Sequence, residues 1–294
     1  MSTDQVSGRA GGRVPGRLDA KTWGIVTVLI LGSIMSVLDT TIVNIALQSL
    51  SRDLHTKLED VQWVVSAYLL SLAAVIPITA WSARCFGAKR LYLVSIALFT
   101  LGSALCGLAH STGQLIMFRV IQGVGGGTIV PVGQMILVKA SGPRNLARVM
   151  SALSVPVVLA PVLGPTIGGL LLDNVGWRWI FFVNLPIGVL AVLTGLRKLP
   201  SDQPEDAGRL DLAGLALVAT GLVGVTYGLA EVGSSADGMM HVALPLLGGL
   251  VLVTAFVVRA LRITQPLLDM RLYLNKAFSA ASVATFGLGA AFYK

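Results

Sequence analysis

The feature that most constrains this chain is a series of unbroken apolar runs, each about twenty residues long. A helix needs about 20 apolar residues to cross a bilayer core of about 30 Å. A membrane-spanning strand would instead alternate apolar and polar residues over about ten positions. The sequence therefore predicts an all-α integral membrane protein. The spans are expected at 23–47, 61–82, 91–109, 114–139, 148–172, 177–198, 210–231 and 240–261.

The composition agrees with this class. Of the 294 residues, 54% are hydrophobic and 12% are charged, whereas soluble domains carry roughly 25% charged residues. The net charge of +8 would suit nucleic acid. However, the basic residues cluster between the apolar runs, where they fix membrane orientation. We therefore expect lipid as the surroundings, no nucleic-acid partner and, because the two cysteines lack metal-ligand spacing, no metal site or cofactor.

Lys and Arg are distributed very unevenly between the two sets of loops. With the N-terminus inside, 17 of the 22 fall on the cytoplasmic side and three on the outer side. Cytoplasmic loops carry the excess of positive charge in membrane proteins. The sequence therefore predicts a multi-pass protein of the plasma (inner) membrane with a cytoplasmic N-terminus.

Composition shifts divide the chain into five parts. Residues rich in Gly, Ser and Arg precede the first span, and a polar stretch with two prolines follows the sixth. The last apolar run starts near Phe278 and is about 16 residues long, slightly short for a span. The expected parts are a disordered cytoplasmic tail (1–22), a six-helix unit (23–198), a cytoplasmic linker (199–209), two additional spanning helices (210–261), and a cytoplasmic loop with an incomplete ninth helix (262–294).

Asp39 interrupts the first apolar run, in "SVLDTTIVNIALQSL". Placing Asp at the centre of a membrane helix costs about 2.5–3.5 kcal/mol, and such carboxylates usually mark ion or substrate paths. Snorkelling from a helix end is the structural alternative, but Asp39 lies well inside its span. Thr40, Thr41 and Asn44 offer hydrogen bonds, so we expect a polar face around Asp39 that lines a cavity.

The fourth span contains an arginine followed by glycines, in "FRVIQGVGGGTIVPVGQ". Arg119 is a candidate partner for Asp39 across the bundle, with Gln122 one turn away, although an arginine near a helix end also snorkels. Gly123 and Gly127 form a GxxxG pair for close helix packing. A phosphate-binding loop is excluded because no strand precedes the glycines and no GK[ST] follows.

The fifth span combines proline and glycine, in "APVLGPTIGG". Pro161 and Pro165, like Pro156 before them, each remove a backbone donor, so a bent helix is expected. Gly164 and Gly168, followed by Gly169, provide a second close-packing surface. Bending and close packing together suit an interface that rocks, and a static kink is the alternative.

Four motifs in order carry a family resemblance: "LDTTIVNIAL", "RVIQGVGGG", "GPTIGG" and "GWRWIFFVNLPIG". Together they resemble the major facilitator superfamily, and more narrowly its fourteen-span drug:proton antiporters of the EmrB/QacA type. The resemblance implies that 23–198 is an N-terminal transporter bundle and that 210–261 is the extra helix pair. It also implies proton coupling or cation recognition at Asp39, proton transfer at Arg119 with Gln122 beside it, and an antiporter motif over 156–169.

The loop between the second and third spans departs from that family. The family pattern is G-x-L-x-D-R-x-G-R-[KR], whereas this chain reads "AWSARCFGAKR". Gly87, Lys89 and Arg90 match, but Arg84 replaces the acidic residue that latches the two bundles on the cytoplasmic side. We expect the charge reversal to alter that gating loop.

The resemblance implies a proton-coupled multidrug efflux transporter whose substrates are cationic or apolar small molecules. An enzyme is not expected, because the sequence offers no paired catalytic carboxylates and no Ser/His constellation. Fourteen spans at about 33 residues each would need roughly 450 residues, so the chain is expected to lack a C-terminal half. The alternative is a non-transporting membrane remnant or scaffold.

Overall fold

The computed structural model describes residues 19–231, 238–264 and 266–292, and this part of the chain contains helices and no strand. Eight helical segments are long and apolar enough to cross a membrane, which confirms the expected all-α membrane architecture. Most of the predicted tail lies outside the described residues, and the first helix begins at Ala20 rather than at residue 23. The segments are Ala20–Asp53, Leu58–Phe86, Ala88–Gly107, Thr112–Gly142, Asn145–Asn174, Arg178–Lys198, Leu212–Glu231 and Val242–Arg262.

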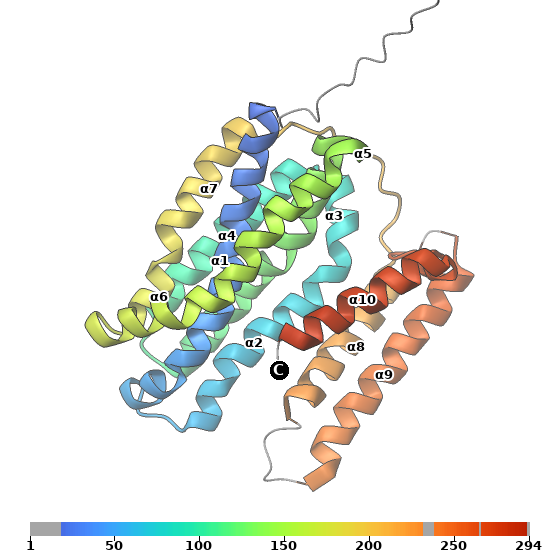
Figure 1. The fold of residues 1–294 in the computed structure, drawn as a ribbon. Helices are drawn as coiled ribbons and strands as arrows, with labels where there is room; N and C mark the ends of the chain where they lie inside the picture. Colours follow the sequence, from blue (N-terminus) through green and yellow to red (C-terminus); the bar gives the residue numbers. More distant parts are fainter. Residues whose placement is uncertain (1–18, 232–237, 265, 293–294) are drawn as a thin grey trace, which may run out of the picture.

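Some spans are divided between two helices, and one helix contains two spans (Figure 1). Pro77 lies in a short 3-10 turn, Ile76–Ile78, that separates the two helices of the second span. In chain order the helices are α1 (Ala20–Asp53), α2 (Leu58–Val75), α3 (Thr79–Phe86), α4 (Ala88–Gly107), α5 (Thr112–Asn174), α6 (Arg178–Phe182), α7 (Asn184–Lys198), α8 (Leu212–Glu231), α9 (Gly238–Arg262) and α10 (Lys276–Phe292).

α5 comprises the fourth and fifth spans, joined at Gly142. This glycine has φ 66° and ψ 167°, in a region of positive φ that a residue without a side chain adopts at no steric cost. It is the position within α5 with non-helical torsion angles. The backbone therefore stays helical through Pro156, Pro161 and Pro165, and the break in this helix is at the glycine and not at the prolines.

α1, α4, α5 and α7 pack side by side, and α8 and α9 form a hairpin on the other side of α2 (Figure 1). α8 meets the bundle through α2, where the rings of Trp63 and Tyr227 stack with centroids 5.6 Å apart. α10 contacts the 3-10 turn Met270–Leu274 just before it. The extra helix pair thus meets the six-helix unit mainly through α2, and Trp81 of α3 also packs against the apolar cluster of that pair.

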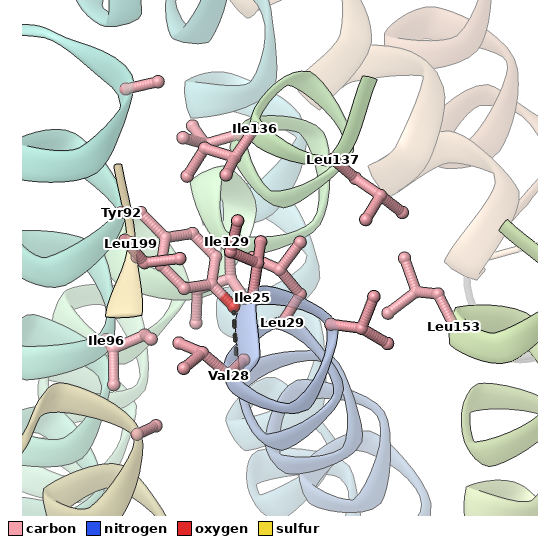
Figure 2. Close-up of a cluster of buried hydrophobic side chains, with 14 of the residues drawn as sticks. Ile25, Val28, Leu29, Tyr92, Ile96, Ile129, Ile136, Leu137, Leu153 and Leu199 are labelled. Atoms are coloured by element: carbon pink, nitrogen blue, oxygen red, sulfur yellow. Dashed lines mark hydrogen bonds between the residues drawn. The ribbon is translucent and has the colours of Figure 1, made fainter. Parts of the chain in front are cut away.

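Two apolar clusters form the core of the six-helix unit. Figure 2 shows the first, in which Ile25 and Leu29 of α1 meet Tyr92 and Ile96 of α4 and Ile129 of α5. The Tyr92 hydroxyl donates to the backbone carbonyl of Val28 in α1 at 3.4 Å. The second cluster contains residues such as Leu38, Ile42, Cys106 and Phe181. Asp39 and its partners lie where the two clusters meet, because Tyr68 belongs to the first and Phe181 to the second.

Candidate functional site

Asp39 lies on the buried face of α1 and has 1% exposure. Met35, Ile42, Val43 and Ala46, which are spaced by three or four residues around it, are buried on the same face. The apolar periodicity that buries α1 therefore carries the carboxylate into the interior of the bundle. Its side chain does not line an open cavity in this conformation, contrary to the expectation from sequence.

The carboxylate of Asp39 is paired with Arg119 of α5. Arg119 Nη1 donates to Asp39 Oδ2 at 2.5 Å, and both side chains are fully buried. Gln122, one helical turn from Arg119, closes a triangle: its Nε2 donates to Asp39 Oδ1 at 2.8 Å and its Oε1 accepts from Arg119 Nη1 at 2.9 Å. The spacing of three residues on a helix places both polar side chains on the face toward α1.

The guanidinium of Arg119 is held from several sides. Its Nε donates to the Val64 carbonyl of α2 at 3.1 Å, and the group lies 4.1 Å from the centre of the Tyr68 ring. Aromatic faces attract cations, more strongly where water is excluded. The Nη2 atom has no hydrogen-bond partner among the described residues. Burying this ion pair with one donor unsatisfied costs desolvation free energy, so stability alone does not explain its presence.

Sequence reasoning missed two further members of this cluster. Asn184, the first residue of α7, donates from Nδ2 to Asp39 Oδ1 at 3.3 Å and to Ser103 Oγ of α4 at 3.1 Å. The Ser103 hydroxyl in turn donates to the Phe181 carbonyl at 2.9 Å. The signal was available, because Asn184 is the polar residue between apolar neighbours in "IFFVNLPIG".

Asn44 does not join the Asp39 cluster. It is exposed, and its amide donates to the Thr40 carbonyl one turn back in α1. Thr40 and Thr41 likewise donate to carbonyls of their own helix. The physical reason is helix geometry: five residues correspond to about 500° of rotation at 3.6 residues per turn, so Asn44 lies about 140° around the helix from Asp39. The polar partners of Asp39 come from other helices instead.

The glycines of the fourth span lie against α2. A Cβ on Gly123 would lie 2.6 Å from Ser71 Cβ and 2.8 Å from the Tyr68 carbonyl oxygen. A Cβ on Gly127 would lie 3.1 Å from the Leu72 carbonyl oxygen. The absence of side chains at these positions brings α2 close enough for Val64 and Tyr68 to reach Arg119.

The glycines of the fifth span behave differently from one another. A Cβ on Gly164 would collide with the Thr41 hydroxyl of α1, and one on Gly168 would lie 3.1 Å from Ile42 Cγ2. Gly169 has no atom within 4 Å of such a Cβ. Two of the three glycines thus bring the fifth span against the first. Pro161 is half-buried and Pro165 is exposed.

The loop between the second and third spans is tied to the linker that follows the sixth. Gly87 has φ 84°, and the Asp202 carboxylate accepts from the amides of Ala88, at 2.6 Å, and Lys89, at 3.2 Å. Lys89 Nζ donates to the carbonyls of Leu196 and Leu199 at the end of α7.

Those contacts put an acidic side chain at this loop even though position 84 is basic. The Arg84 carbonyl accepts from the Glu205 amide at 2.8 Å, while the side chains of Arg84 and Arg90 are exposed. An acid at a helix N-terminus and a cation at a C-terminus both suit the helix dipole. Asp202 of the linker therefore holds the start of α4, and Lys89 of α4 holds the end of α7. In the described part of the chain, no group of three His, Cys, Asp or Glu side chains is placed to hold a metal ion.

Comparison with known sequences gives a family match over nearly the whole chain. Residues 29–293 match the profile of the Major Facilitator Superfamily. The "Multidrug resistance protein B homolog" of Mycobacterium tuberculosis is 41% identical over 280 residues, which cover 94% of this chain and 52% of that protein. The "Multidrug export protein EmrB" of Haemophilus influenzae is 36% identical over 260 residues, covering 87% of this chain and 51% of that protein.

A third relative matches most of the chain, and two solved structures share its fold. The "Putative multidrug resistance protein MdtD" of Escherichia coli is 32% identical over 270 residues, covering 91% of this chain and 56% of that protein. The chain thus spans about half the length of the curated relatives it matches. The crystal structure of a D-xylose-proton symporter superposes with a TM-score of 0.55 at 14% identity, covering 81% of this chain and 68% of that one. The POT family transporter PepTSo gives 0.56 at 18% identity, covering 79% and 51%.

Proposed function

Since the chain belongs to the Major Facilitator Superfamily, we propose that it takes part in the proton-coupled export of cationic or apolar drug-like molecules. The observation that carries the proposal is the buried Asp39–Arg119 pair, with both side chains at 0% exposure. Charged residues inside a membrane bundle usually mark a functional site. The names of the relatives, two of them resistance proteins and one an export protein, support drugs as the substrate class.

Asp39 is proposed to carry the proton. In its charged form it binds Arg119 and Gln122, as the structure has them. Protonation removes the negative charge, so the Arg119 guanidinium loses its counter-ion while it remains buried. A buried cation without a partner is strongly unfavourable. Uptake of a proton by Asp39 therefore favours a change in the conformation of the bundle. The deprotonated form of Asp39 is the one that would favour a cationic substrate.

The conformational change is proposed to use the close glycine contacts. Transporters of this kind move one bundle against another around a site near the midplane. All four glycines belong to α5: Gly123 and Gly127 lie against α2, and Gly164 and Gly168 lie against α1, so helices meet there without intervening side chains. Small residues at such contacts let the helix backbones approach closely, and the proposed change would shift the helices at these contacts. The cytoplasmic loop containing Arg84, Gly87, Lys89 and Arg90 would gate the inner face.

Location and domain organisation belong to the same proposal. The uneven distribution of Lys and Arg supports a plasma-membrane protein with a cytoplasmic N-terminus. The packing of α8 on α2 supports treating the two additional helices as a unit next to the transporter bundle. The proposed parts are 1–22, 23–198, 199–209, 210–261 and 262–294, with the boundaries given above.

Dye efflux in cells tests the role of Asp39. A version of the chain extended to the length of its relatives is expressed in cells lacking their own exporters, as wild type and as Asp39→Asn. We expect the substitution to abolish proton-driven efflux. Asp53→Asn is the matched control, because Asp53 is an exposed aspartate at the end of the same helix, and it should leave efflux unchanged. Proton-driven efflux that survives Asp39→Asn rejects the proposed role.

A second candidate function is that of a non-transporting membrane scaffold. The observation that favours it is the length of the chain, which spans about half of the relatives it matches. Expression of these 294 residues alone discriminates the two. Insertion into the membrane without any drug resistance supports the scaffold for the isolated chain, and resistance that depends on Asp39 supports transport.

A further inference from the structure

The three donors around Asp39 suit a carboxylate and not a carboxylic acid. Arg119 Nη1 donates to Oδ2, and Gln122 Nε2 and Asn184 Nδ2 both donate to Oδ1. A protonated Asp39 would carry an O–H that needs an acceptor. Its neighbours as placed point N–H groups toward it, so one of them has to turn when the proton arrives.

Asn184 is the neighbour best placed to turn. Arg119 has donors only. The Gln122 oxygen already accepts from Arg119 Nη1 at 2.9 Å and from Cys106 Sγ at 3.5 Å, so rotation of its amide would break both contacts. Rotation of the Asn184 amide by half a turn presents Oδ1 to Asp39 and exchanges one contact, the one with Ser103.

Ser103 can follow that rotation because a hydroxyl both donates and accepts. In the structure it accepts from Asn184 Nδ2 and donates to the Phe181 carbonyl. After the Asn184 amide turns, the Ser103 O–H turns from Phe181 toward Asn184 Oδ1. The direction of each hydrogen bond in the chain Asp39–Asn184–Ser103 is then reversed, and the Phe181 carbonyl is released.

The released carbonyl lies at a weak point of the sixth span. α6 ends at Phe182 and α7 begins at Asn184. Pro186 has no amide hydrogen, so the Phe182 carbonyl four residues earlier lacks its helical donor. Loss of the Ser103 bond from the adjacent Phe181 carbonyl removes a contact that holds this junction to α4.

We propose that Asn184 is a positioning residue that, with Ser103, reports the protonation state of Asp39 to the α6–α7 junction through a reversible hydrogen-bond relay. The proposal rests on the proposed function for the meaning of the proton, but its geometry and its tests do not require transport. Among the described residues, the titratable groups next to Asp39 are Arg119 of α5, Tyr68 of α2 and Cys106 of α4. α6 and α7 contribute Phe181 and Asn184, which do not titrate.

The first experiment titrates Asp39 directly. Infrared spectra of the purified chain in detergent are recorded against pH, and the carboxylic-acid band of Asp39 is assigned by its loss in Asp39→Asn. Asn184→Leu keeps the side-chain volume but removes one donor to the carboxylate. We expect the midpoint of the band to move to higher pH by on the order of one unit. Asn174→Leu is the control, because Asn174 is exposed and bonds within α5, and it should leave the midpoint unchanged.

An isosteric variant covers a folding failure of Asn184→Leu. Asn184→Asp places a second carboxyl beside Asp39, so the two should titrate in two coupled steps. A single step at the wild-type midpoint in either variant overturns the positioning role of Asn184. If no acid band disappears with Asp39→Asn at any pH, Asp39 does not take up a proton, and both the relay and the proposed proton coupling are rejected.

The second experiment tests the relay through Ser103 at one fixed pH. Asp39→Asn imitates the protonated state, because its amide can donate to Asn184. We expect faster amide hydrogen exchange over residues 181–188 in Asp39→Asn than in wild type. In the Ser103→Ala background this difference should disappear. Ser95→Ala is the matched control, a buried serine hydroxyl of the same helix bonded instead to Leu91 and Thr128, and the difference should persist there. Equal differences in both serine backgrounds overturn the relay while leaving the role of Asp39 in transport untouched.

Discussion

Among the described residues, two arginine–aspartate pairs join helices in opposite surroundings. Arg119 and Asp39 join α5 to α1, and neither side chain has any exposure. Arg259 and Asp211 join the end of α9 to the start of α8, with the arginine 41% exposed and the aspartate 5%. Asp211 accepts from Arg259 Nε and Nη2 and from the Gly214 amide, so its partners are complete.

The difference supports our proposal that the same chemistry serves two purposes. A pair with one partly exposed side chain keeps access to water and contributes modestly to stability. A pair in the interior must be held by neighbours, and apolar residues of the same size would often be at least as stable there. The Asp39–Arg119 pair is therefore better explained by a change of charge during function than by stability, whereas the Asp211–Arg259 pair is explained as a fastening of the extra helix pair.

Removal of one partner of the interior pair should have the largest effect. Asp39→Ala leaves the Arg119 guanidinium buried without a counter-ion, and we expect a loss of about 3–5 kcal/mol in the free energy of unfolding. Denaturant titration of the detergent-solubilised chain measures it. The double variant Asp39→Leu/Arg119→Met removes both charges and should recover most of the loss. A double variant as unstable as the single one would contradict the interpretation of the pair as a functional rather than a structural element.

How much of this site the sequence predicts depends on how far apart in the sequence the contacting residues are. The apolar runs predict the spans because the membrane requires about twenty such residues wherever they occur. Asp39 and Arg119 stand out because each is a charge in an apolar run. Asn184 is also a polar residue among apolar neighbours, but its partner could not be predicted, since its contact with Asp39 joins positions 145 residues apart. Asp202 at the cytoplasmic loop was missed for the same reason, because a linker acid is ordinary until the fold brings it to α4.

The support of the Asp39–Arg119 pair should also weaken when a neighbouring helix is displaced while both charges are kept. In Gly123→Ala the new Cβ would meet Ser71 and the Tyr68 carbonyl, so α2 must move away from α5. Overpacking of this kind costs about 1–3 kcal/mol, and it withdraws Val64 and Tyr68 from Arg119. Gly169→Ala is the matched control, a glycine of the same helix with no atom near the new Cβ. Thermal unfolding should show a lower Tm for the first variant and no loss for the second.

The peripheral pair should give the smallest of the three effects and the one that depends on pH. Burial raises the pKa of the Asp211 carboxyl, but the hydrogen bonds from Arg259 and the Gly214 amide and the charge of Arg259 outweigh it, so the pKa lies below its usual value. A carboxyl whose pKa is lower in the folded state stabilises the fold at neutral pH and loses that contribution as the pH falls through the lowered pKa. Asp211→Asn should therefore cost roughly 1 kcal/mol at neutral pH.

The same variant provides the pH test. The Tm values of wild type and Asp211→Asn should differ at neutral pH and converge in acid, where the wild-type carboxyl is protonated. Lys139→Ala sets the baseline, because its pair with Glu205 is 3.6 Å long with both side chains more than half exposed; such pairs contribute little at any pH. A Tm difference for Asp211→Asn that persists unchanged into acid would mean that packing of the side chain, and not its charge, fastens α8 to α9. The contrast between the two pairs would then be one of burial alone.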